Sequence, residues 1–219
     1  TEIAEAIKEM PKPLWQLALV YLFQWYAMFC YWQYVSHSIA QSVWKATSEN
    51  KELYSEAVAW TGLVNGFYNV VTFLSAFALV AVARKYGAKW VHAGALILAA
   101  VGLWMFPHIS NKYMLFVPMI GFGIAWASMM GVPYIIAVAA IPRERYGVYM
   151  GIINMMIVIP MLIQTLTFGK VYHNFLGATP GNAIMFAGAL LFMAAMATLL
   201  IKTPKQESNL PMPARVGGH

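Results

Sequence analysis

Residues 121–164 read GFGIAWASMMGVPYIIAVAAIPRERYGVYMGIINMMIVIPMLIQ, and this stretch decides the fold of the chain. Two apolar blocks flank the short charged segment 142–145, and each block is long enough to cross a bilayer core of about 30 Å as a helix. Glycines recur in both blocks, and each block carries one proline, Pro133 or Pro160. Small residues let membrane helices approach closely, and a proline weakens a helix at a defined point. The stretch therefore predicts two membrane helices that are joined by a tight turn and can bend.

The composition of the whole chain agrees with a membrane protein. Of its 219 residues, 61% are hydrophobic and 10% are charged, whereas soluble domains contain about 25% charged residues. We interpret the net charge of +6 as loop charge that sets orientation in the membrane, not as affinity for nucleic acid. The single cysteine, Cys30, cannot form a disulfide within the chain, and no cluster of Cys and His predicts a metal or cofactor site.

Apolar runs along the chain predict an all-α membrane protein with six transmembrane helices. Residues 1–12 form an amphipathic lead-in, residues 13–203 the six-helix transmembrane domain, and residues 204–219 a flexible polar tail. Residues 45–56 are the longest polar loop between spans. The predicted spans cover residues 14–44, 57–83, 88–106, 113–141, 147–172 and 182–201.

Basic residues are distributed unequally between the two sides of this predicted bundle. Ten Lys and Arg residues fall on the side of the two termini, and four fall on the opposite side. Because basic residues are enriched in cytoplasmic loops, we expect a multi-pass protein of the inner (plasma) membrane with both termini in the cytoplasm.

The polar residues inside the spans are uncharged, since no Asp, Glu, Lys or Arg lies deep within any of them. Asn65, Tyr68, Asn69 and Thr72 have the spacing of one helix face. Amides donate and accept hydrogen bonds, and aromatic rings offer flat apolar faces, so the combination suits a neutral sugar. The alternative interpretation is that these amides join helices to one another. The predicted substrate-binding residues are Gln24, Tyr31, Asn65, Tyr68, Asn69, Trp126, Asn154 and Gln164.

Three stretches carry a resemblance to a known family: QSVWKATSENKELYSEAVAWTGLVNGFYNVVTF (41–73), VARKYGAKWVHAGALILAAVGL (82–103) and IPRERYGVYMGIINMMIVIPMLIQ (141–164). The chain resembles the C-terminal six-helix half of a major facilitator superfamily sugar transporter. More narrowly, it is similar to bacterial relatives of the sucrose/maltose-type solute carriers in the glycoside–pentoside–hexuronide group. The resemblance implies half of a twelve-helix fold, alternating access, and proton coupling through an N-terminal six-helix half.

The resemblance also implies roles for the turns and prolines. We expect a gating or hairpin role for Arg84, Lys85, Gly87, Pro133, Arg143, Arg145 and Pro160. The expected partners are the lipid bilayer, a neutral sugar, and either an N-terminal half or another membrane subunit. The alternative functions are a non-transporting half-carrier that acts as a membrane scaffold, and an intramembrane enzyme. The enzyme has little support, because no catalytic pairing of nucleophile and base is visible.

Overall fold

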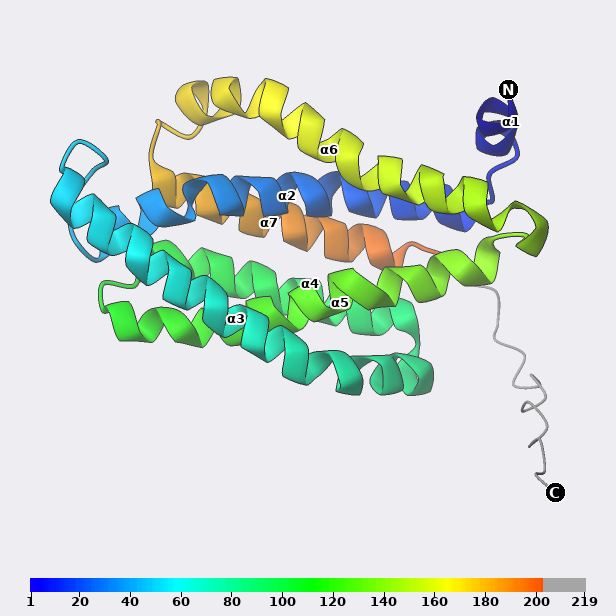
Figure 1. Ribbon diagram of the computed structural model, residues 1–219, viewed down its shortest axis with the longest axis horizontal. Helices are drawn as coiled ribbons and strands as arrows, with labels where there is room; N and C mark the ends of the chain where they lie inside the picture. Colours follow the sequence, from blue (N-terminus) through cyan, green and yellow to red (C-terminus); the bar gives the residue numbers. More distant parts are fainter. Residues whose placement is uncertain (203–219) are drawn as a thin grey trace.

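The computed structural model describes residues 1–202, which form a bundle of long helices without a β-strand (Figure 1). Short 3₁₀ helices η1 (Phe106–His108), η2 (Lys112–Leu115) and η3 (Arg143–Arg145) occur in the connections. The predicted tail, 204–219, lies outside the described residues. The α-helices are α1 (Glu2–Lys8), α2 (Lys12–Ser42), α3 (Lys51–Tyr86), α4 (Ala88–Met105), α5 (Phe116–Ala140), α6 (Tyr146–Asn174) and α7 (Pro180–Leu199).

Each predicted span corresponds to one long helix, but the polar loop is shorter than expected. The prediction of a loop over residues 45–56 is wrong in its second half, because α3 begins at Lys51. The Asn50 side chain accepts a hydrogen bond from the Leu53 N–H, and Glu52 lies in the first turn. An Asn cap and an early acidic residue both stabilise a helix N-terminus, so α3 extends beyond its apolar run.

The prediction of an all-helical protein is confirmed for the described residues, and five of the six predicted spans form helices that are long and apolar enough to cross a membrane. By length and composition, α3, α4 with η1, η2 with α5, η3 with α6, and α7 can each cross a membrane. The exception is α2, which at 31 residues is about 45 Å long. Its length is sufficient, but its glutamines, serines and histidine lower its hydropathy.

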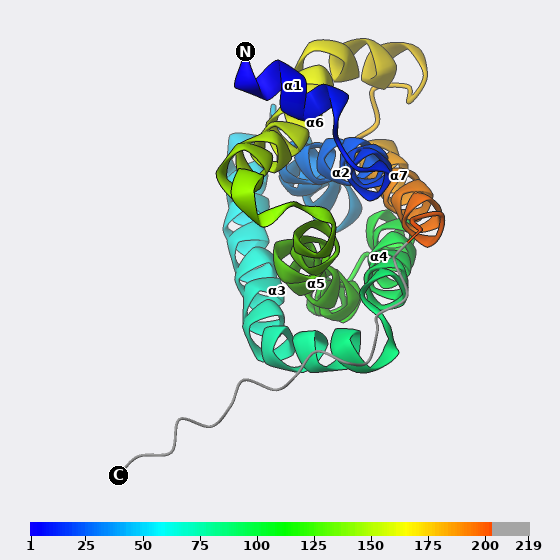
Figure 2. The same cartoon turned by 90° about the vertical axis from the view of Figure 1, so that its right-hand side faces the viewer.

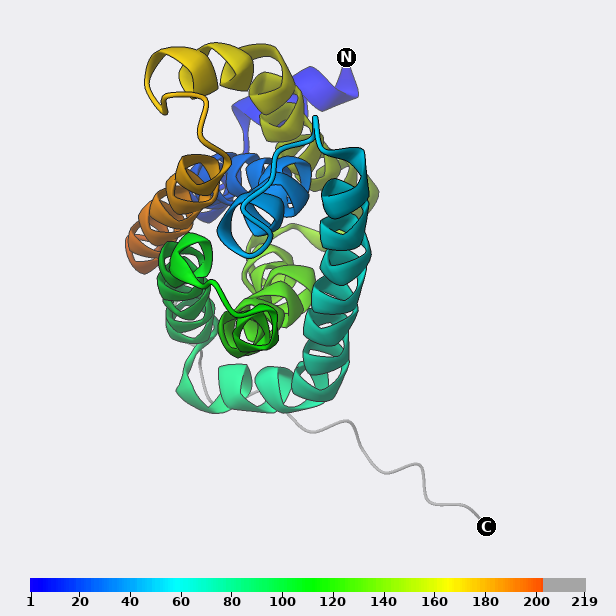
Figure 3. The same ribbon diagram turned by 90° about the vertical axis from the view of Figure 1, so that its left-hand side faces the viewer.

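The exceptional helix α2 lies at the centre of the bundle. Viewed along the bundle, α3 lies on one side, α4 and α7 lie on the other, and α6 crosses beside α2 (Figures 2 and 3). Helix α2 packs on α7, α6, α3 and α5, while α4 joins α5 to α7. The one long helix without a strongly apolar stretch is therefore surrounded by the others.

Close approach between α3 and α5 depends on Gly123. A Cβ atom at this position would lie 2.6 Å from the Tyr68 carbonyl oxygen and 2.7 Å from Val71 Cβ. The Thr72 hydroxyl lies 2.8 Å from both the Tyr68 and the Gly123 carbonyl oxygens and can donate to either. A glycine and a threonine thus bring two membrane helices into backbone contact.

The chain start, two tight turns and the end of α7 meet at one end of the bundle. The Lys89 ammonium group donates to the carbonyl of Ile201 at 3.1 Å. Gln16 accepts a hydrogen bond from the backbone of Lys202, and Arg145 of η3 forms an ion pair with Glu9. Most basic residues of the described chain lie at this end, which we call the basic end.

Large apolar faces of α3 and α6 remain uncovered. In its most apolar 18-residue window, α3 is only 11% buried and α6 only 22%, against 50% for α4 and 56% for α5 and α7. The side chains exposed on these two faces include Phe73, Leu74, Phe77, Leu162 and Leu166.

Candidate functional site

The predicted site residues Tyr31 and Asn65 meet between α2 and α3. The fully buried Tyr31 hydroxyl donates to Asn65 Oδ1 at 2.9 Å and lies 3.5 Å from Met119 Sδ. A buried hydroxyl requires a partner, and here an amide 34 residues away along the chain provides it. Asn65 is only partly buried, so its amide nitrogen lies at the edge of the packed interior.

An aromatic cluster surrounds this pair and includes the predicted residues Tyr68 and Trp126. The Trp126 ring makes edge contacts with Trp25 and Trp32, at centroid distances of 5.8 and 5.5 Å. The Trp32 indole nitrogen donates to the Tyr68 hydroxyl at 3.4 Å. Trp32 and Trp126 are partly exposed. The cluster therefore presents indole surface beside an amide.

The predicted residue Gln24 lies in a different place, within a buried chain of hydrogen bonds across three helices. His92 of α4 lies 2.8 Å from Gln24 Oε1 through Nε2 and 2.7 Å from Ser128 Oγ through Nδ1. With Oε1 as an acceptor, His92 carries its proton on Nε2, and Ser128 donates to Nδ1. The partners of His92 lie 36 and 68 residues away along the chain, so local sequence spacing does not indicate this contact.

Unsatisfied polar atoms lie next to this chain of bonds. Gln24 Nε2, the Tyr21 hydroxyl and the Trp25 indole nitrogen are buried and have no hydrogen-bond partner within the described structure. These residues share one face of α2, because they are three and four positions apart. The interior next to α4 and α5 is therefore polar and rich in donors.

Gln164 joins α6 to the opposite side of α2. Its fully buried amide nitrogen donates to Gln33 Oε1 at 2.8 Å and lies 3.6 Å from Cys30 Sγ. Its Oε1 atom has no partner among the described residues. This amide connects two helices, in agreement with the alternative interpretation of the intramembrane amides.

The side chains of the remaining two predicted binding residues are exposed and do not join the buried hydrogen bonds of these clusters. Asn69 is exposed, and its amide donates to the Asn65 carbonyl of its own helix at 2.8 Å. Asn154 is exposed on α6. The structure thus brings Tyr31, Asn65, Tyr68 and Trp126 together and places the other four predicted residues elsewhere.

The predicted gating residues occupy turns and helix interiors. Gly87 alone connects α3 to α4 with a φ of +98°, a conformation that favours glycine. Arg84, Lys85 and Arg143 are exposed. Pro133 and Pro160 are buried inside α5 and α6, where each removes one backbone hydrogen bond from its helix.

No family model matches the chain. Within residues 1–202, no group of three or more His, Cys, Asp or Glu side chains is placed to hold a metal ion. The aromatic and amide surface between α2, α3 and α5 is the place where the largest group of predicted binding residues comes together.

Proposed function

We propose that the chain is the C-terminal six-helix half of a secondary active sugar transporter of the major facilitator type. The observation that carries this proposal is the cluster of Tyr31, Asn65, Tyr68, Trp32 and Trp126. These side chains combine an amide, hydroxyls and partly exposed indole rings without any charge. This chemistry fits a neutral sugar, whose hydroxyls need donors and acceptors and whose ring C–H groups pack on aromatic faces.

In this proposal α2 is the sixth membrane span. A helix with many polar side chains can lie in a membrane when protein surrounds it, because its polar groups then face partners instead of lipid. Helix α2 meets this condition through its contacts with α3, α5, α6 and α7. In this proposal the bundle lies in the plasma membrane. The excess of basic residues at the basic end favours a cytoplasmic location for that end.

Coupling to a proton gradient is assigned to the N-terminal half. Every acidic residue of the described chain lies in or just after α1, in the loop before α3, in its first turns, or in η3. In carriers of this type an intramembrane carboxylate takes up the coupled proton, and the described spans carry no buried carboxylate. The proposed half-carrier therefore shapes and gates the sugar path, while a partner half supplies the energy.

One observation also supports the alternative of a non-transporting scaffold subunit. The uncovered apolar faces of α3 and α6 suit lipid and a partner protein equally well. A stable complex with membrane proteins that contain no carrier half would favour this alternative.

The test is sugar uptake into proteoliposomes under a proton gradient. We expect uptake by the carrier that includes the segment encoded upstream in the same reading frame, and none by this chain alone. Asn65→Ala in that carrier should raise the sugar concentration for half-maximal uptake about tenfold, because one hydrogen-bonding group is lost. Asn154→Ala serves as the comparison from outside the cluster.

Two results would contradict the proposal. Uptake by this chain alone would show that coupling does not need a second half. An unchanged sugar affinity in Asn65→Ala, with normal folding, would remove the cluster from the binding site.

A further inference from the structure

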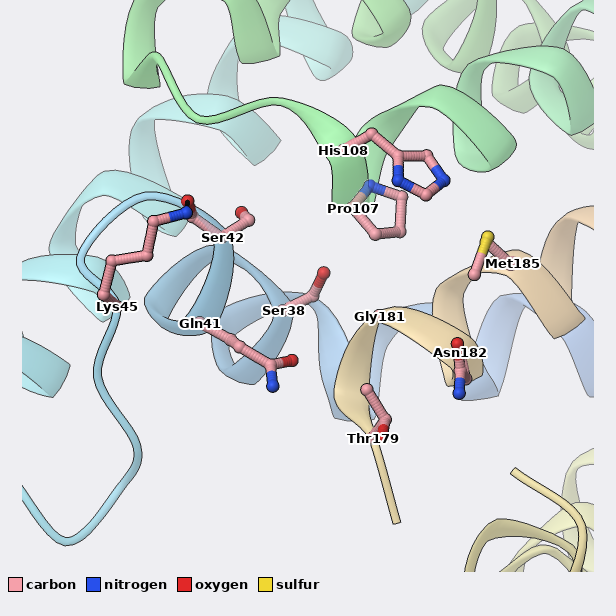
Figure 4. A pocket seen from close by; sticks show the side chains of 10 residues that line it. All are labelled: Ser38, Gln41, Ser42, Lys45, Pro107, His108, Thr179, Gly181, Asn182 and Met185. Atoms are coloured by element: carbon pink, nitrogen blue, oxygen red, sulfur yellow. Dashed lines mark hydrogen bonds between the residues drawn. The ribbon is translucent and has the colours of Figure 1, made fainter. Parts of the chain in front are cut away.

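A polar pocket lies at the end of the bundle opposite the basic end. It has a volume of about 300 Å³ and lies between the last turns of α2, η1 and the first turn of α7 (Figure 4). None of the predicted site residues lines it. Its polar lining includes Ser38, Gln41, Ser42, Lys45, His108 and Asn182.

Two serine hydroxyls in this pocket are buried without a hydrogen-bond partner. Ser38 and Ser42 are only 1% and 8% exposed, and neither Oγ atom has a partner in the described structure. Helical hydroxyls ordinarily donate to the carbonyl four residues earlier, as Thr61 and Thr198 do here at 2.8 and 2.7 Å. In Figure 4 the Ser38 hydroxyl points into the space that the labelled side chains enclose. An acceptor in the pocket would satisfy these donors.

The first turn of α7 provides one further donor to the same pocket. Pro180 has no N–H group, and the Asn182 N–H donates to the Thr179 carbonyl at 3.0 Å. The Gly181 N–H therefore remains without an acceptor among the described residues. A Cβ atom at Gly181 would lie 2.9 Å from Pro107 Cβ, so the glycine allows this turn to approach η1. The N-terminus of a 20-residue helix attracts anions through its dipole and this free N–H group.

Lys45 makes the pocket positive. Its ammonium group donates to the Ser42 carbonyl at 2.7 Å, which offsets the partial negative charge at the C-terminus of α2. Because an ammonium group carries three donors, two remain for a ligand. The pocket lining contains no carboxylate.

We propose that this pocket binds a phosphate group, supplied by inorganic phosphate or by a phospholipid headgroup. The two serine hydroxyls and the first turn of α7 donate to the phosphate oxygens, and Lys45 provides the countercharge. This site is separate from the aromatic cluster, and its test does not depend on sugar transport.

The first experiment titrates the full chain with sodium phosphate in an uncharged maltoside detergent, at constant ionic strength. We expect saturable binding by calorimetry and a matching rise in Tm. Lys45→Gln should weaken binding about tenfold, since it removes one charge-assisted contact, and Ser38→Ala should weaken it several-fold. Lys51→Gln is the matched control, because Lys51 is exposed at the start of α3 and does not line the pocket; its binding should equal that of the wild type.

The second experiment distinguishes the two sources of phosphate. Native mass spectrometry of protein extracted from phosphatidylglycerol nanodiscs should show retained lipid if the headgroup is the ligand, with loss of that lipid in Lys45→Gln but not in Lys51→Gln. Binding of free phosphate without retained lipid assigns the site to the inorganic ion. The proposal is overturned if neither phosphate nor lipid binds, or if the two lysine variants behave alike.

Discussion

Helices α2 and α3 are the two longest in the structure, with 31 and 36 residues, and they have opposite surroundings. Helix α2 has no stretch apolar enough to count as a membrane span by composition and lies at the centre of the bundle, whereas α3 has such a stretch, which is only 11% buried. In water the apolar helix would be expected inside. In a membrane the uncovered surface meets lipid, so polar side chains gather where other helices offer partners. The comparison indicates that the central helix is recognised by the polar side chains within it, and not by a high mean hydropathy.

The largest expected difference in stability is between two variants, one that removes an amide from α2 and one that removes an amide from α3. Gln24→Ala removes the partner of buried His92 and leaves a cavity, so it should lower the free energy of unfolding by about 3 kcal/mol. Asn69→Ala, on exposed α3, should change it by less than about 0.5 kcal/mol. Denaturant unfolding in detergent measures both, and equal losses would contradict the contrast between the helices.

The second prediction concerns the one close contact that fixes α3 to α5. Gly123→Ala should destabilise the protein by about 2 kcal/mol, because the added methyl group meets the backbone of Tyr68. Gly131→Ala in the same helix is the control, since a Cβ atom there has no neighbour within 4 Å. Thermal unfolding of the pair should show a lower Tm for the first variant only.

A smaller loss of stability is expected when the Tyr31 hydroxyl, which joins α2 to α3, is removed. Tyr31→Phe leaves the ring in place but removes the hydrogen bond to Asn65, so the loss of stability should be about 1 kcal/mol. The control is Tyr113→Phe, because that side chain is exposed and should tolerate the change. If Tyr31→Phe is as stable as the wild type, the bond between α2 and α3 contributes nothing.

The smallest effect on stability is expected on the uncovered face of α3. Phe77 is 74% exposed, so Phe77→Ser should change the unfolding free energy of the detergent-solubilised chain by less than about 0.5 kcal/mol. Val64→Ser, at a buried position of the same helix, should be clearly destabilising. Parallel denaturant titrations of the two variants measure the difference. If Phe77→Ser were the more destabilising variant, the assignment of the buried face of α3 would be wrong.

The course of the chain could be predicted from sequence because local signals determine it. Apolar runs gave the helices, and Gly87 and Pro142 marked two of the tight turns. The start of α3 was missed because a single side chain, Asn50, caps it outside the apolar run. The four-residue face on α3 was only partly correct, since Tyr68 is buried and Asn69 is exposed.

The partners of the polar side chains could not be predicted in the same way. Gln24 and Ser128 reach His92 from 68 and 36 residues away, and nothing in local spacing indicates that the three helices meet at this depth. The pocket at Ser38 and Ser42 was also missed, because two serines in a helix are unremarkable until their hydroxyls are found without partners. Sequence patterns thus indicate which residues need partners, and the packing of distant helices decides which partners they have.

The single-residue link at Gly87 has a mechanical consequence. A joint of one residue has no slack, and its backbone conformation, with φ at +98°, is one that other residues adopt only with strain. Helices α3 and α4 are therefore joined without an intervening loop, so a change in the tilt of α3 is expected to displace the start of α4. Lateral forces from the surrounding lipid on α3 would in this way reach His92, one turn beyond the joint.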